Sequence, residues 1–264
     1  MQVHLVIGVQ ITWAVSVAAQ VLVCAVVLAR GHFRRLPFFT SYIFLNILQA
    51  VLLFATYRIF GDSSPVAKSV GWWSEAVTLA ARICATVEII WLVIQAYRGI
   101  WGLTWRLLAA CCSAALLIAV FASGGDAYWA LIEGDRGFHL VFAVGLISVL
   151  FLLHHYSVPV HPVYKALLVG FCFYSCAKVL MNTVRLLYGQ FEQYEQVWQA
   201  GVVLAFSVVM IWWAVALRHS LPARIAQPAT PAPDYARMTP QIQLQLEAIN
   251  RQLMNFWKIE EPNR

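Results

Sequence analysis

Residues 107–121 read LLAACCSAALLIAVF and residues 141–153 read VFAVGLISVLFLL, and these two stretches decide the fold. Neither stretch carries a charged residue, and both are apolar on every side rather than at alternate positions. A strand of an outer-membrane barrel would alternate between apolar and polar residues over about 10 residues, so the pattern excludes a barrel. The two stretches instead predict α-helices that cross a lipid bilayer.

The rest of the chain has the same character. Of 264 residues, 61% are hydrophobic and 11% are charged, whereas ordinary soluble domains have roughly 45–50% and 25%. Apolar runs approach the roughly 20 residues that cross the hydrocarbon at about 1.5 Å per residue. The predicted spans are residues 6–28, 38–60, 72–97, 106–122, 137–155, 165–188 and 197–217. We therefore predict an all-α, polytopic membrane protein, with a seven-transmembrane-helix bundle over residues 1–218.

Charged residues in the loops separate by sign, and this separation orients the spans. Basic residues without any acid follow the first, third, fifth and seventh spans: Arg30, Arg34, Arg35, Arg98, Arg106, Lys165, Arg218 and Arg224. The other loops carry mainly acids, namely Asp62, Asp126, Glu133, Asp135, Glu192 and Glu195, beside Lys68 and Arg136. Basic loops stay in the cytoplasm. We expect the amino terminus outside and the carboxyl terminus inside a cell membrane, either a plasma membrane or an inner membrane.

The composition changes after the bundle. Residues 219–238 contain four prolines among alanines, which is typical of an extended, semi-rigid linker. Thr239 and Pro240 then supply an N-cap and a first-turn proline for a cytoplasmic amphipathic helix and tail over residues 239–264. Its apolar stripe, at spacings of 4, 3, 4 and 3, consists of Ile242, Leu246, Ile249, Leu253 and Phe256. The stripe predicts pairing with a second copy of the chain, docking on a cytoplasmic protein or contact with the lipid bilayer.

Ionisable residues inside the spans concentrate in the third and the sixth. The third span holds Glu75, Arg82 and Glu88, and the sixth holds Lys178 and Arg185. A charge in mid-helix costs about 2.5–3.5 kcal/mol on insertion scales, so each residue calls for a partner or a function. We expect both helices to turn their polar faces inward, because a lipid-facing polar stripe is unfavourable.

Depth along the helices suggests which residues meet. Glu75 and Arg185 both lie within about one turn of the outer boundary and predict a structural ion pair. Arg82 and Lys178 both lie roughly 15 Å below that boundary. Because these two share a sign, either a nearby acid, Glu75 or Glu88, or a bound anion must relieve their repulsion.

Glu88 lies deeper still, at the level of Gln20 and Asn46 in the first two spans. Three polar groups at one level predict an interhelical hydrogen-bond layer. On the sixth span, the Asn182 amide lies on the same polar face as Lys178. The candidate ligand-binding residues are therefore Arg82, Lys178, Asn182 and Glu88.

Several functional classes are disfavoured. The net charge of +6 comes from residues at helix ends, so it does not indicate nucleic-acid binding. The cysteines fall inside the spans and indicate packing, and the sequence calls for no cofactor. Histidines near the cytoplasmic ends lack a repeated two-ligand spacing, so we expect no metal site. The seventh span has neither the lysine of retinal proteins nor the proline of G-protein-coupled receptors.

The charged interior and the cytoplasmic helix together suggest a function. We expect a receptor-like or sensor-like protein that binds a small polar or anionic ligand within the bundle and relays its state to a cytoplasmic partner. The alternative is a structural or accessory subunit of a membrane complex, with the same charges held in salt bridges. A small-molecule transporter or membrane enzyme is the further alternative.

Overall fold

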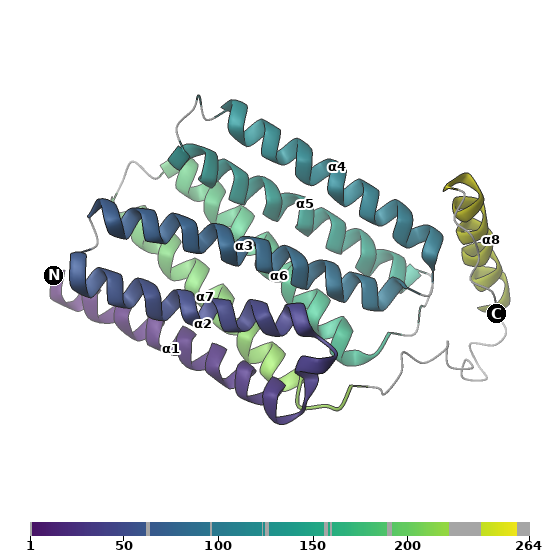
Figure 1. Ribbon diagram of the computed structural model, residues 1–264, viewed down its shortest axis with the longest axis horizontal. Helices are drawn as coiled ribbons and strands as arrows, with labels where there is room; N and C mark the ends of the chain where they lie inside the picture. The colour runs from purple at the N-terminus through teal and green to yellow at the C-terminus, as the bar shows by residue number, and fades with distance from the viewer. Residues whose placement is uncertain are drawn as a thin grey trace.

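All the regular secondary structure is helical in the part of the chain that the computed structural model describes, which covers residues 2–61, 64–95, 97–122, 124, 127–155, 158, 160–188, 192–221 and 239–257. The helices are α1 (Gln2–Ala29), η1 (His32–Arg34), α2 (Pro37–Phe60), α3 (Pro65–Ile94), α4 (Arg98–Ala122), α5 (Ala127–His155), α6 (Pro162–Tyr188), α7 (Glu192–Ala216) and α8 (Thr239–Trp257). Helices α1 to α7 lie side by side in a bundle, and α8 lies beyond one end of it (Figure 1).

The exterior of the bundle is apolar. Among the residues that the structure describes, six helices are long and apolar enough to cross a membrane, with candidate spans at Ile11–Ala29, Pro37–Phe60, Pro65–Ile94, Ile100–Phe121, Glu133–His155 and Pro162–Val184. A shorter apolar segment, Ala200–Ala216, lies in α7. Large side chains such as Phe121 and Phe151 are 81% and 67% exposed, which suits contact with lipid and not with water. The chain is therefore a multi-pass helical membrane protein, as its composition predicts.

Several helices extend beyond the predicted spans. Helix α3 begins at Pro65 instead of residue 72, because the Ser64 hydroxyl accepts a hydrogen bond from the Ala67 N–H at 3.1 Å and caps the helix. Helices α4 and α5 begin eight and ten residues before their predicted spans, at Arg98 and Ala127. Hydropathy marks the part of a helix that lies in hydrocarbon, whereas the backbone hydrogen bonds continue into the more polar end segments.

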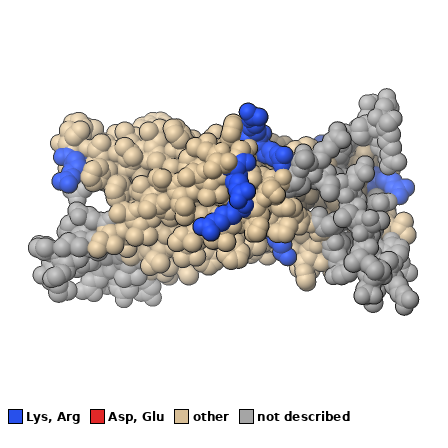
Figure 2. All heavy atoms as spheres, turned by 90° about the horizontal axis from the view of Figure 1, so that it is seen from below, with Lys and Arg blue, Asp and Glu red and all other residues tan. Residues whose placement is uncertain are grey.

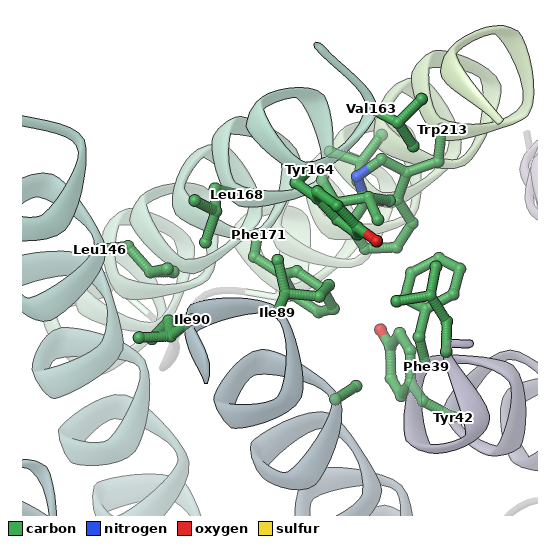
Figure 3. Close-up of a cluster of buried hydrophobic side chains, with 14 of the residues drawn as sticks. Phe39, Tyr42, Ile89, Ile90, Leu146, Val163, Tyr164, Leu168, Phe171 and Trp213 are labelled. Carbon is green, nitrogen blue, oxygen red and sulfur yellow. The ribbon is translucent and has the colours of Figure 1, made fainter. Parts of the chain in front are cut away.

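An aromatic cluster holds α2, α6 and α7 together (Figure 3). The Trp213 ring lies 5.2 Å from the Phe39 ring and 4.6 Å from the Phe171 ring, measured between centroids. All three side chains are at most 1% exposed. Gly170 permits this contact, because a Cβ atom there would collide with the Trp213 indole.

Helix α6 occupies a central place, since it contacts α3, α5 and α7. Helix α1 contacts both α2 and α7. The segment after α1 reaches the end of α7, where the His32 imidazole Nε2 lies 2.9 Å from the Leu217 carbonyl oxygen and the Arg35 guanidinium donates to the Leu221 carbonyl. Because α6 packs against both α3 and α5, the polar faces of these three helices are turned toward one another.

Helix α8 contacts α4. Its Met254 side chain is buried and Leu253 packs against the core of the bundle, whereas Ile249 and Phe256 are 39% and 73% exposed. The predicted apolar stripe is therefore divided between a packed and an exposed part. The side chains of its other two members, Ile242 and Leu246, lie outside the described residues.

Candidate functional site

A group of polar side chains lies between four helices, with the half-exposed Glu75 side chain at its edge, and we call it the charged cluster. It comprises Tyr42 and Gln49 of α2, Glu75 and Arg82 of α3, Asp135 and His139 of α5, and Tyr174, Lys178 and Asn182 of α6. Each helix presents these residues at intervals of four or seven positions, which is the spacing of one helical face. The cluster is therefore formed by the inward polar faces that the sequence predicts for α3 and α6.

Two carboxylates surround the Lys178 ammonium group. Its Nζ atom lies 3.3 Å from Asp135 Oδ2 and 3.6 Å from Glu75 Oε1. The Asn182 amide donates to the same Asp135 oxygen at 2.8 Å, and Gln49 donates to Glu75 Oε2 at 3.1 Å. Lys178 is 8% exposed, so its charge is neutralised inside the bundle.

Arg82 has a different environment. Its Nε atom donates to the Tyr42 hydroxyl at 3.3 Å, and its Nη1 atom lies 2.8 Å from His139 Nε2. The guanidinium carbon also lies 4.9 Å from the centre of the Tyr174 ring, within cation–π distance. Within the part of the chain that the structure describes, no carboxylate lies within 4.0 Å of this guanidinium group.

The contact with Arg82 fixes the tautomer of His139. An arginine is always protonated and can only donate, so His139 Nε2 must accept and the ring proton must sit on Nδ1. The His139 side chain is 1% exposed, and Nδ1 is buried without a hydrogen-bond partner among the described atoms. The same holds for Asp135 Oδ1, which lies 3.4 Å from His139 Nε2.

The formal charges of the cluster balance. Arg82 and Lys178 are cationic, Glu75 and Asp135 are anionic, and His139 is neutral when it accepts from Arg82. The cluster nevertheless contains a buried N–H donor, His139 Nδ1, and a buried carboxylate oxygen, Asp135 Oδ1, that have no hydrogen-bond partner among the described atoms. An unsatisfied buried polar group costs about 1–3 kcal/mol, so a small molecule that paired with these atoms would be stabilised.

Glu88 is not part of the charged cluster. Its two carboxylate oxygens accept hydrogen bonds from the Phe38 and Phe39 N–H groups at 3.2 and 2.8 Å. These N–H groups belong to the first turn of α2, where no intrahelical acceptor exists. Glu88 therefore caps α2 from a neighbouring helix, and its prediction as a ligand-binding residue finds no support in this geometry.

The predicted hydrogen-bond layer of Glu88 with Gln20 and Asn46 is wrong. The Gln20 amide donates to the Ser16 hydroxyl at 3.4 Å, and the Asn46 amide donates to the Tyr42 carbonyl at 2.7 Å. Both contacts lie within one helix. Equal depth did not bring the three groups together, because depth along a helix axis does not determine how the helix is rotated about it.

The predicted ion pair of Glu75 with Arg185 stays a prediction, since the Arg185 side chain lies outside the described residues. The histidines near the basic ends of the helices also form no visible metal site. Among the described residues, no group of three or more His, Cys, Asp or Glu side chains is placed to hold an ion. At this end, burial lowers the pKa of His161, and the nearby His219 lowers it further.

Sequence reasoning missed Asp135, His139 and Tyr42 as partners of the two cations. The predicted fifth span, residues 137–155, leaves Asp135 in an acidic loop, whereas α5 begins ten residues before that span. The four-residue spacing of Asp135 and His139 was the available signal. Comparison of the chain with protein-family models, with curated proteins and with solved structures gave no match.

Proposed function

We propose that the protein is a receptor-like or sensor-like membrane protein of seven spans, with its amino terminus outside and its carboxyl terminus in the cytoplasm of a cell membrane. Helix α7 has 25 residues, which at about 1.5 Å per residue exceeds the roughly 30 Å thickness of the hydrocarbon. In Figure 2, most basic side chains gather in one band across the molecule, and no described acidic side chain appears on that face. Such a band suits one membrane boundary.

The environment of Arg82 is the observation that supports a ligand site. Lys178 already has two carboxylate neighbours, whereas the neighbours of Arg82 are two tyrosines and a histidine. The His139 Nδ1–H beside it is a second buried donor without a partner among the described atoms. A small ligand with an acceptor oxygen would give Arg82 the anionic partner that it lacks among the described residues, so we place the ligand at Arg82, beside His139.

The charge balance of the cluster narrows the ligand chemistry. Because two cations already face two carboxylates, a dianion would leave the buried cluster with a net charge of −2. A bound monoanion would leave the cluster with a net charge of −1. A ligand that carries a proton, or that donates a hydrogen bond to Asp135 Oδ1, would leave less buried charge uncompensated. The favoured ligand is therefore a small monocarboxylate or a neutral polar molecule with a carboxyl group.

Helix α8 is the proposed output of the receptor. It contacts α4 through one side and exposes Ile249 and Phe256 on another. An exposed apolar surface on a helix outside the bundle suits a cytoplasmic protein partner or a second copy of the chain. Because α4 contacts both α5 and α8, a shift of α4 against α5 would also change the position of α8.

The test is to identify what the protein retains during purification. The parent chain, Arg82→Met and Arg58→Met are extracted in a mild detergent, and bound small molecules are measured by mass spectrometry. Arg58 serves as the control because it is exposed and contacts Phe54 outside the cluster. We expect a small anion or carboxylic acid with the parent and with Arg58→Met, but not with Arg82→Met. Equal retention by all three chains, or none, would count against the site.

The internal charge balance favours one alternative function, a structural or accessory subunit of a membrane complex. Lys178 with Glu75 and Asp135 connects α3, α5 and α6 without any ligand. In this case the same extraction yields no small molecule, and a defined set of membrane proteins copurifies with the parent chain.

A further inference from the structure

The Nε2 atom of His139 faces two groups with opposite requirements. It lies 2.8 Å from Arg82 Nη1 and 3.4 Å from Asp135 Oδ1. The guanidinium group can only donate and requires a lone pair on Nε2, whereas the carboxylate can only accept and requires a proton there. One ring nitrogen cannot meet both requirements at once. In the structure Nε2 satisfies the shorter contact, and Asp135 Oδ1 has no hydrogen-bond partner among the described atoms.

Charged groups from three helices surround this nitrogen. The titratable and charged side chains around His139 are Arg82 and Glu75 of α3, Asp135 of α5, and Tyr174 and Lys178 of α6. The Lys178 ammonium group faces Glu75 and the other oxygen of Asp135, Oδ2. Asp135 Oδ1 is therefore the carboxylate oxygen that remains for His139.

Helix α4 also packs against α5, and its charged residues lie at another level. A Cβ atom at Gly137 would lie 3.2 Å from Ala115 Cβ, which places Ala115 near the level of His139. The charged residues of α4, Arg98 and Arg106, are at least nine residues before Ala115, which is more than two helical turns. The closest titratable side chain to Ala115 in the sequence of α4 is the thiol of Cys112, and thiols are ordinarily uncharged below about pH 8. The charges of α3, α5 and α6 therefore decide the protonation of His139.

An anion at Arg82 would remove the conflict at Nε2. An acceptor oxygen that takes the hydrogen bond of Arg82 Nη1 replaces His139 as the acceptor, so the lone pair of Nε2 is released. This lone pair can then form an N–H bond with a proton from the aqueous phase, and the imidazole gains one positive charge. The new Nε2–H group would donate to Asp135 Oδ1 in a charge-assisted hydrogen bond. No other covalent bond of the protein forms or breaks.

The charge balance favours the same coupling. Two cations face two carboxylates in the charged cluster, so a bound monoanion alone leaves a net charge of −1. One proton on His139 returns the cluster to neutrality. Because an uncompensated buried charge is costly, the anion and the proton each stabilise the binding of the other.

We propose that the site at Arg82 binds a monoanion together with one proton, which His139 accepts. The coupling rests on the proposed function, because it requires an anion at Arg82. Coupling between two ligands is reciprocal. The affinity for the anion therefore falls as the pH rises through the range in which a histidine ordinarily loses its charge.

Trifluoroacetate is the probe, because this monocarboxylate stays ionised and any proton taken up on binding must go to the protein. Its binding to the full chain in detergent is measured by isothermal titration calorimetry in two buffers with different ionisation enthalpies, which counts the protons taken up. For the parent we expect close to one proton for each bound anion at about pH 6. We also expect an affinity at least tenfold lower at about pH 7.5 than at about pH 5.5. This measurement needs no variant to fold.

Two glutamine variants assign the proton. His139→Gln keeps an acceptor oxygen for Arg82 but cannot take up a proton in this pH range, whereas His154→Gln removes an exposed histidine near the other end of α5. We expect His139→Gln to bind trifluoroacetate without proton uptake and with an affinity that does not depend on pH. His154→Gln should behave like the parent.

The outcomes separate this inference from the proposed function. Binding of trifluoroacetate to the parent without proton uptake would overturn the coupling and leave the anion site in place. Proton uptake that persists in His139→Gln would assign the proton to another group and would also overturn the coupling. A parent that binds no trifluoroacetate at any of these pH values would contradict both the coupling and the anion site.

Discussion

Asp135 on α5 and Lys178 on α6 form a buried ion pair with their charged atoms 3.3 Å apart, although 43 residues separate them in the chain. Removing one partner of a buried ion pair typically costs about 3–5 kcal/mol. We expect Asp135→Asn to lower the stability of the bundle by about 2–3 kcal/mol, because Glu75 still faces Lys178. Thermal unfolding in detergent measures the loss.

Glu133→Gln is the control for that change. This change removes a carboxylate two residues before Asp135. Glu133 pairs with Arg136 at 3.1 Å, and the Arg136 side chain is 38% exposed. An exposed pair contributes about 0–1 kcal/mol, so this variant should melt close to the parent. Equal losses for Asp135→Asn and Glu133→Gln would show that the buried pair does not stabilise the bundle.

Glu88 should stabilise the start of α2. Replacement by alanine leaves the Phe38 and Phe39 N–H groups without their acceptor, and loss of a helix cap costs about 0.5–2 kcal/mol. Glu88→Gln keeps one oxygen acceptor and should lose less. Hydrogen exchange at the Phe38 and Phe39 amides should be faster in Glu88→Ala than in the parent. Unchanged exchange at these amides would contradict the capping role.

Gly170 should tolerate no side chain. A methyl group there would collide with the Trp213 indole, and overpacking of this kind costs about 1–3 kcal/mol. Gly71→Ala is the matched control, since its Cβ atom would lie 3.9 Å from Leu53 Cδ2, an ordinary contact. Thermal unfolding should therefore show a loss for Gly170→Ala, and no loss for Gly71→Ala. A stable Gly170→Ala would mean that α6 and α7 are not so closely packed.

The proposed topology predicts labelling from opposite sides of the membrane. A reporter fused after Arg218 should be cytoplasmic, because basic loops stay inside. A cysteine introduced at Asp126, which lies outside the described residues, should react with impermeant reagents from outside. The reverse pattern would overturn the orientation, and a cytoplasmic location of both sites would mean that one helix does not cross.

Most of the fold was predictable because the bilayer imposes a length and a polarity on every span. The position of Glu75 and Lys178 on inward faces followed from helical periodicity alone. The contact partners of these two residues could not be predicted in this way. A contact between two helices depends on how each helix is rotated about its axis and on which helices are neighbours, and a single sequence specifies neither. Asp135 illustrates this limit, since an acid near the end of a helix looks like a loop residue until α6 is placed beside it.

Glu88 illustrates a second limit. A buried carboxylate in a span suggested a ligand or a polar layer, but its acceptors serve the backbone of α2. The sequence could not reveal this role, because Phe38 and Phe39 show no polar side chain. Backbone donors at helix starts are hidden in a sequence, although they need partners as much as side chains do.

The binding of an anion at Arg82 is the central claim, and anion-dependent melting tests it most directly. The parent, Arg82→Met, Lys178→Met and Arg58→Met are melted in detergent with and without small monocarboxylates, sulfate and chloride. A ligand at 100 times its Kd stabilises the folded state by about 2.7 kcal/mol. We predict that a monocarboxylate raises the melting temperature of the parent and of Arg58→Met more than sulfate does. The melting temperature of Arg82→Met should not respond to any of these anions. Lys178→Met should melt at a lower temperature than the parent when no ligand is added. A parent that responds to none of the anions, together with Arg82→Met and Lys178→Met variants that are merely less stable, would contradict the claim.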